Sequence, residues 1–375
     1  MKERINQVGQ LLCIGFEGQQ CGAELRSLLT EIRPGGVIFF QRNIASPEQF
    51  CTLVADIRDV LKDSRPFLAI DQEGGQVDRF RELLGPLPSA REAAQAGLAF
   101  ELGDLAGREL AAFGLNVDFA PVLDLGSPQS HTVLGTRTAG DTPQQVIQFA
   151  EQFLLGLHGW NILGCGKHFP GLGPGKKDSH IGMPTINKTA DLLWEGDLLP
   201  FRTLGASNSL MTMVMVAHAW YPELEQSFSP GSASAASPTP ASLSLNIVSR
   251  LLRDRIGFSG LVVCDDLEMG GALEGRTIED AAVDAVRAGC NLLLICRKAS
   301  NVERAYTAVI REMERDSEFR RKVSAQSPSR IGFREPQMSF ANVEGLRGDV
   351  REFGEKVRLR LAQRMHVSES DSMGN

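Results

Sequence analysis

Eight short apolar segments recur along the chain, and a longer segment with helical spacing follows each of them. Runs that are apolar without alternation are typical of parallel strands covered on both faces. Helix start signals agree, since Ser46 before Pro47 supplies a cap and a first-turn proline. The pattern predicts these strands: Leu11–Phe16, Gly36–Phe40, Pro66–Ile70, Val117–Pro121, Ile162–Gly166, Thr212–Ala217, Gly260–Cys264 and Asn291–Cys296.

Eight strand–helix units predict an α/β fold, a (β/α)₈ barrel of the TIM type, with an open doubly wound sheet as the alternative. The polar residues favour the barrel, because they follow strand ends and a barrel brings those ends to one rim. They are Asp71 after the third strand, Asp124 near the fourth, Lys167 and His168 after the fifth, His218 after the sixth, and Asp265 with Asp266 after the seventh.

The chain divides by composition near residue 316. We expect residues 1–316 to form the barrel and residues 317–375 to form a polar, partly helical C-terminal extension whose last residues are disordered. Ser227–Pro240 is rich in Ser, Ala and Pro and predicts a mobile surface loop after the sixth strand.

Charge and cysteine content narrow the class of protein. The 375 residues include 39 Lys and Arg against 46 Asp and Glu, a net charge of −7, which argues against nucleic acid or an anionic membrane as the partner. The seven cysteines form no C-x-x-C pair and lie mostly in apolar runs, as reduced core residues do. With no signal peptide and no apolar run near 18 residues, we expect a cytoplasmic monomer that does not insert into membranes.

The densest group of polar residues follows the fifth predicted strand. The loop that begins at Lys167 and His168 and ends at Asp178 and His180 combines cations, imidazoles, a carboxylate and several Gly and Pro residues. Asp178 and His180 are two residues apart, so in an extended segment their side chains lean to the same side. A carboxylate beside an imidazole fixes the tautomer of the ring and raises its basicity.

Three further motifs have a structural alternative. Asp265-Asp266 ends an apolar run, where one Asp would cap the next helix and the other would point into the rim. Asp71-Gln72-Glu73-Gly74-Gly75, with Arg79 after it, is either a solvated glycine turn or a close approach of backbone and ligand. Arg137 alone reads as a solvated loop residue.

Two kinds of site are not supported by the motifs. Gly171–Lys177 lacks the first Gly and the final Ser or Thr of a phosphate-binding loop, because Pro170 and Lys177 occupy those positions. His168, His180 and His218 show no metal-ligand spacing, so we expect neither a metal nor a cofactor.

Six ordered segments between about Val8 and Cys296 resemble family-3 glycoside hydrolases, in particular the bacterial cytosolic β-N-acetylglucosaminidases of cell-wall recycling. The segments are Ile70–Gly75 with Arg79, Asn116–Asp124, Lys167–Gly171 leading to Asp178-Ser179-His180, Ala217-His218, Pro240–Ser244, and Cys264–Met269. The resemblance implies a retaining hydrolase that releases terminal β-linked N-acetylglucosamine, with muropeptide fragments (GlcNAc on anhydro-muramic acid) as substrate.

The resemblance also implies a role for each site residue. Asp265 is the nucleophile and His180 the general acid/base with Asp178 as its partner, while the sugar is bound by Asp71, Arg79, Arg137, Lys167 and His168. A retaining glycosidase needs a nucleophile and a proton donor on opposite faces of the anomeric carbon, and an imidazole donor is an exception to the usual carboxyl pair.

Some positions depart from the family pattern, and three alternatives stay open. Gln76 stands where Arg is usual, Leu172 where many members have His, and Cys264 where Ser or Thr precedes the nucleophile. The alternatives are a phosphorylase, because a neutral His donor does not repel phosphate, a catalytically inactive GlcNAc-binding protein, and a family-3 β-glucosidase, whose acid usually comes from a further domain.

Overall fold

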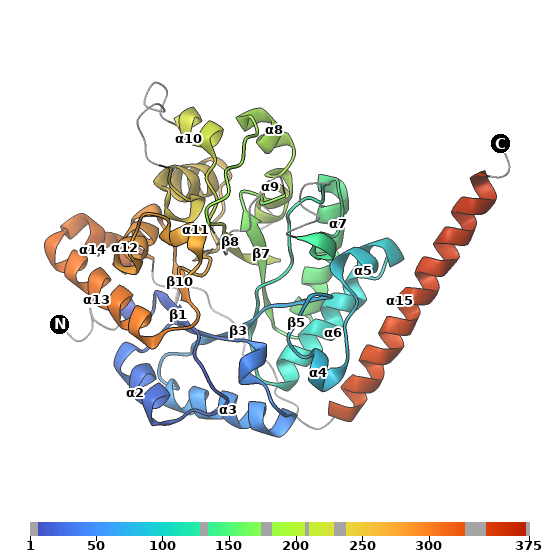
Figure 1. Cartoon of the computed structure of the whole chain (residues 1–375), viewed down its shortest axis with the longest axis horizontal. Helices are drawn as coiled ribbons and strands as arrows, with labels where there is room; N and C mark the ends of the chain where they lie inside the picture. Colours follow the sequence, from blue (N-terminus) through green and yellow to red (C-terminus); the bar gives the residue numbers. More distant parts are fainter. Residues whose placement is uncertain are drawn as a thin grey trace.

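Eight parallel strands close into a barrel in the computed structural model (Figure 1). The structure describes residues 7–127, 134–173, 182–206, 210–228, 238–326 and 343–372, with the side chains of the last helix described as far as Arg364. The order around the barrel is β1-β10-β9-β8-β7-β6-β3-β2, so the first and last strands pair and no barrel edge is left open. The predicted barrel is therefore confirmed, and the open sheet is wrong.

All eight strands lie where the apolar runs predicted them. Their bounds are β1 Leu12–Ile14, β2 Gly36–Phe39, β3 Phe67–Ile70, β6 Val117–Asp118, β7 Leu163–Phe169, β8 Met211–Val216, β9 Leu261–Cys264 and β10 Leu292–Ile295. One element was not predicted, a small antiparallel hairpin of β4 Gln72–Gly74 and β5 Val77–Asp78 that follows β3. Its glycines have positive φ, 81° at Gly74 and 60° at Gly75, which is why the segment reads as a turn in the sequence.

Helices follow the strands and form the outer layer of the barrel (Figure 1). The α-helices are α2 Ala23–Ile32, α3 Pro47–Val60, α4 Arg81–Leu84, α5 Ala90–Ala96, α6 Ala99–Ala112, α7 Pro143–His158, α8 Ala190–Glu195, α9 Leu199–Ala206, α10 Pro222–Phe228, α11 Gly270–Leu273, α12 Ile278–Ala288, α13 Ala299–Arg315, α14 Ser317–Ala325 and α15 Val343–Ser372. Short 3₁₀ turns are η1 Gln41–Asn43, η3 Gly135–Arg137 and η4 Ala241–Leu243, and η5 Asn246–Arg255 is a π-helix. Ser46 caps α3 as predicted, because its side chain accepts from the Gln49 N–H.

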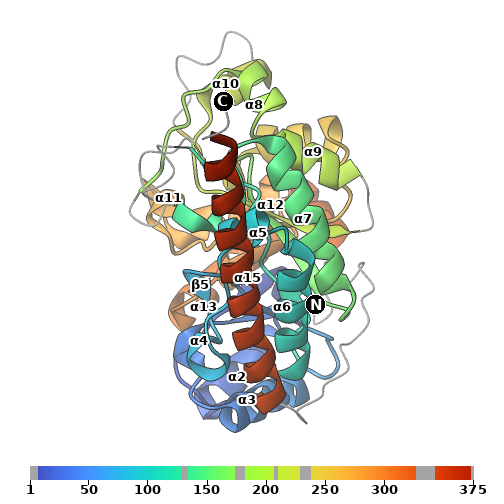
Figure 2. The same cartoon turned by 90° about the vertical axis from the view of Figure 1, so that its right-hand side faces the viewer.

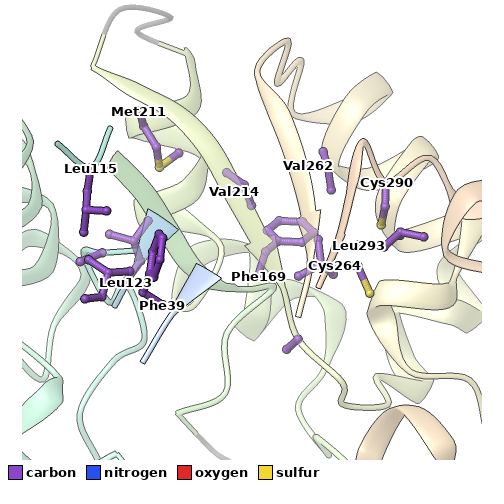
Figure 3. Close-up of a cluster of buried hydrophobic side chains, with 14 of the residues drawn as sticks. Phe39, Leu115, Leu123, Phe169, Met211, Val214, Val262, Cys264, Cys290 and Leu293 are labelled. Carbon is purple, nitrogen blue, oxygen red and sulfur yellow. The ribbon is translucent and has the colours of Figure 1, made fainter. Parts of the chain in front are cut away.

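Alternate residues of each strand divide the core into two layers. One set points into the barrel and forms an interior cluster that includes Cys13, Phe67, Cys165, Met215 and Leu294. The other set faces the helices, and Figure 3 shows part of it, with Phe39, Phe169 and Val214 among the labelled side chains. Burial on both strand faces is the reason that the sequence shows continuous rather than alternating apolar runs.

The C-terminal helix lies against the outside of the barrel (Figure 2). α15 packs on α4, α5 and α6 through one buried stripe, made of Leu346, Val350, Phe353 and Val357. The helix continues to Ser372. The division at residue 316 and disorder of the last residues stay predictions, and residues 229–237 of the predicted Ser-rich loop lie outside the described part of the chain.

The cysteines lie where the sequence analysis expected reduced core residues. All seven cysteines are free thiols, and every one except Cys51 is buried. No helix in the described part of the chain is long and apolar enough to cross a membrane.

Candidate active site

The C-terminal ends of the strands surround a cavity of about 370 Å³. Six of the eight residues singled out in the sequence line it: Asp71, Arg79, Arg137, Lys167, His168 and Asp265. They lie directly after β3, directly after the hairpin, in η3, in β7 and directly after β9, which are far apart in the sequence. The other two, Asp178 and His180, lie outside the described residues.

The sequence analysis placed Lys167 after the fifth strand, but the structure places it inside strand β7. The strand runs on to Phe169 because its polar residues find partners across the barrel end. Nζ of Lys167 lies 2.8 Å from Oδ1 of Asp71 and 2.6 Å from Oε1 of Glu73, and the lysine side chain is only 2% exposed. Burial alone would lower the pKa of Lys167, but the two carboxylates outweigh it and raise the pKa above its usual range. The ammonium stays charged inside the protein.

Glu73 is a site residue that the sequence reasoning missed. Its carboxylate accepts two hydrogen bonds from Arg137, from Nε at 2.8 Å and from the Nη2 atom at 2.9 Å, in addition to the contact with Lys167. Burial would raise the pKa of Glu73, yet the two cations hold it well below its usual range. Arg137 is therefore largely buried in an ion pair, and its interpretation as a solvated loop residue is wrong. The sequence did contain a signal for Glu73. This acid lies between an apolar strand and two glycines, whose backbone can approach a ligand closely.

Asp71 and Arg79 present polar atoms toward the cavity. The Arg79 Nη2 atom lies 3.5 Å from Oδ2 of Asp71, and the guanidinium sits 5.7 Å from the ring centre of Phe40. Burial would raise the pKa of Asp71, but Lys167 and Arg79 outweigh it and lower the pKa. Nε of Arg79 is buried and has no hydrogen-bond partner among the described residues.

His168 is oriented by Asp124, a pairing that the sequence analysis did not predict. Nδ1 of the ring lies 2.7 Å from Oδ2 of Asp124, and the same carboxylate accepts the backbone N–H groups of His168 and Leu172. Because the carboxylate is the acceptor, Nδ1 carries the proton and Nε2 is left as the ring atom available to a ligand in the cavity.

The two acids at the end of β9 make different contacts. The predicted helix cap is wrong, because Met269 and neither Asp is the N-cap residue of α11. Asp266 makes the structural contacts, since its Oδ1 accepts from the backbone N–H of Glu268 at 3.0 Å and of Cys296 at 3.2 Å. Asp265 accepts one hydrogen bond, from the N–H of Asp266 to its Oδ1 at 2.8 Å. No described residue donates to its other oxygen, and the carboxylate lines the cavity, so it is placed to attack a bound electrophile.

Replacing Asp266 with Asn should make the protein less sensitive to pH. Burial raises the pKa of Asp266 from 3.8 to about 6, so the folded state favours the protonated acid. This contribution to stability is complete below pH 3.8 and is lost as the pH rises through about 6. An Asn oxygen accepts the same two N–H groups without a charge. The difference in unfolding free energy between Asp266→Asn and wild type should grow by on the order of 2–3 kcal/mol from pH 4 to pH 7. Urea unfolding at several pH values measures it, and parallel curves would contradict it.

The sequence matches the model of the glycosyl hydrolase family 3 N-terminal domain over residues 4–326. The chain belongs to this family. The β-hexosaminidase of Alkalilimnicola ehrlichii is 36% identical over 311 residues, which are 80% of this chain and 84% of that protein. The β-hexosaminidase of Pseudomonas aeruginosa PAO1 is 34% identical over 307 residues, 80% of this chain and 86% of that protein.

Two solved structures share the fold. A β-N-acetylglucosaminidase from Paenibacillus sp. FPU-7 superposes with a TM-score of 0.81 at 30% identity, over 94% of this chain and 68% of that one. NagZ from Neisseria gonorrhoeae gives a TM-score of 0.73 at 26% identity, over 92% of this chain and 97% of that one. The resemblance read from the six motifs is therefore confirmed, and the family-3 chain is a glycoside hydrolase of the β-hexosaminidase group.

Among the described residues of the family-3 hydrolase, no group of three or more His, Cys, Asp or Glu side chains could hold a metal ion. Absence of a cofactor, a monomeric state and a cytoplasmic location stay predictions.

Proposed function

We propose that this family-3 hydrolase removes terminal β-linked N-acetylglucosamine with net retention of configuration. Asp265 attacks the anomeric carbon and forms a glycosyl–enzyme intermediate, which water then hydrolyses. His180 protonates the leaving group in the first step and deprotonates water in the second, with Asp178 holding its ring. The observation that carries this proposal is the Asp265 carboxylate, which lines the cavity with one oxygen not bonded to any described residue.

The paired charges that line the same cavity as Asp265 suit a sugar bound in one orientation. Asp71 accepts hydrogen bonds from hydroxyl groups, and Arg79, Arg137 and Lys167 donate to hydroxyl or amide oxygens. His168 offers Nε2. Because these side chains are held by one another before a ligand arrives, little rotamer entropy is lost on binding.

The natural substrate that we propose is a muropeptide fragment that carries GlcNAc on anhydro-muramic acid. Its support is the likeness to proteins named β-hexosaminidase and β-N-acetylglucosaminidase, together with the motif resemblance. The proposed cleavage of the sugar is supported by the residues that line the cavity. The proposed leaving group is supported only by the likeness to these proteins and by the motif resemblance.

One experiment tests the chemistry. The protein is given an aryl N-acetylglucosaminide, and a slow fluorinated analogue traps the intermediate, which is then mapped to one peptide. We expect aryl release and an adduct on the peptide that contains Asp265. Release of sugar 1-phosphate only in the presence of phosphate would indicate a phosphorylase, binding without cleavage an inactive sugar-binding protein, and a preference for the aryl glucoside a β-glucosidase.

His180→Ala should affect substrates in proportion to the basicity of their leaving group. Loss of a general acid costs roughly 10²–10⁴-fold where the leaving group needs a proton, and little where it leaves as a stable anion. Aryl N-acetylglucosaminides whose phenols span a range of pKa values measure this dependence. Equal losses across the series would contradict the assignment of His180 as acid.

A further inference from the structure

Two of the motifs, Ala217-His218 and Pro240–Ser244, have no role in the site as described so far, yet they meet in the structure. The backbone of the second segment pairs with the first, because the Ser242 N–H donates to the Ala217 carbonyl at 3.1 Å and the Ala241 N–H to the Ala219 carbonyl at 2.8 Å. The side chains then meet as well: Oγ of Ser242 lies 2.7 Å from Nδ1 of His218, and both residues are completely buried.

The direction of each hydrogen bond follows from its partners. Nε2 of His218 lies 3.0 Å from the backbone carbonyl oxygen of Asp266. A carbonyl oxygen can only accept, so Nε2 carries the proton. Nδ1 of the neutral ring is then an acceptor, and the Ser242 hydroxyl donates to it. A chain of donors therefore runs from Ser242 through His218 to Asp266.

That chain ends next to the carboxylate of Asp265. His218 binds the backbone carbonyl of Asp266, and the backbone N–H of Asp266 donates to Oδ1 of Asp265 at 2.8 Å. Ser242 is itself anchored, since its carbonyl accepts from the Cys290 thiol at 3.4 Å and its hydroxyl interacts with the thiol of Cys264, the residue before Asp265.

We propose that His218 and Ser242 are positioning residues that fix the turn at Asp265-Asp266 and so aim the nucleophilic carboxylate at the anomeric carbon. The proposal builds on the proposed function of Asp265. Neither side chain lines the cavity, so neither contacts the sugar; both act through Asp266. A small error in the position of a reacting group is costly, because about 1 Å of misplacement can cost on the order of 10²-fold in rate.

Two substitutions at one position separate this role from simple packing. His218→Gln keeps a donor near the position of Nε2, and His218→Asn keeps a polar group only near Nδ1. We expect His218→Asn to lower kcat by on the order of 10²-fold with KM unchanged, while His218→Gln stays close to wild type. Ser242→Ala, which leaves the Nε2 bond in place, should lower kcat less than His218→Asn does, again with KM unchanged. Thermal unfolding midpoints verify that each variant is folded.

The readouts are kcat and KM on an aryl N-acetylglucosaminide and the rate at which the fluorinated analogue labels Asp265. Equal losses in His218→Gln and His218→Asn, a change confined to KM, or an unchanged labelling rate in His218→Asn would overturn the positioning role. If His218→Asn does not fold, an unchanged kcat in Ser242→Ala overturns it instead. A wild-type protein that is never labelled at Asp265 overturns the proposed function, and this proposal with it.

Discussion

Asp265→Asn should lower turnover of an aryl N-acetylglucosaminide by roughly 10⁴–10⁶-fold, because the amide cannot form the covalent glycosyl intermediate. The fold should persist, since the Asn oxygen still accepts the N–H of Asp266 that the carboxylate accepts in the wild type. Binding of the sugar should also survive, because Asp71, Arg79 and Lys167 are unchanged. Steady-state kinetics and ligand titration measure the two effects.

A matched control removes a carboxylate in the same way at a distance from the cavity. Asp104 on α6 accepts from Nε1 of Trp160 at 2.8 Å, and an Asn oxygen can replace it there. Asp104→Asn should therefore keep wild-type turnover. Substantial residual activity in Asp265→Asn would show that the nucleophile is another residue.

The configuration of a rescue product gives a second check on Asp265. In Asp265→Gly, azide can enter the space left by the carboxylate and attack the anomeric carbon from the same face, which yields the α-glycosyl azide. In His180→Ala, azide attacks the glycosyl–Asp265 intermediate from the opposite face and yields the β-azide. Identical anomers from the two variants would contradict the assignment of these residues to opposite faces.

The barrel could be predicted from the sequence because its strands are buried on both faces. Runs such as Leu261–Cys264 are apolar throughout, and some are followed by a helix with clear start signals, as Ser46 and Pro47 show for α3. The hairpin β4–β5 could not be predicted in this way. Apart from Val77 its residues are polar or glycine, and Glu73 is buried because it pairs with cations from distant segments.

The site could be predicted in part, and the difference has a physical cause. Residues at strand ends, such as Asp71 and Asp265, were found because barrel topology alone places them at one rim. Glu73 and the burial of Arg137 were not found, because an ion pair across 64 residues leaves no periodic signal in either segment. Asp124 was placed near the rim, but its role as partner of His168 depends on the register of β7, which the sequence does not show.

The structure connects stability and sugar binding through Glu73. The carboxylate touches both Arg137 and Lys167, so its removal leaves two largely buried cations with one remaining buried carboxylate, Asp71. Breaking one partner of such a buried pair typically costs about 3–5 kcal/mol. The two cations should then repel each other and lose the positions from which we propose that they bind the sugar.

Glu73→Gln should therefore lower the free energy of unfolding by about 3–5 kcal/mol at pH 7 and raise KM for the aryl N-acetylglucosaminide. The matched control is Glu279, a half-buried residue at the surface that makes a similar two-point contact with Arg304 at 2.7 and 2.8 Å. Glu279→Gln should cost no more than about 1 kcal/mol.

The effect of Glu73→Gln should depend on pH. The pKa of Glu73 is lowered in the folded state, so the stabilisation that its charge provides is complete above the usual pKa near 4.5. This stabilisation is lost as the pH falls below that value. Urea unfolding of wild type and Glu73→Gln should thus converge at acidic pH, and a constant difference would show that Glu73 acts by packing and not by charge.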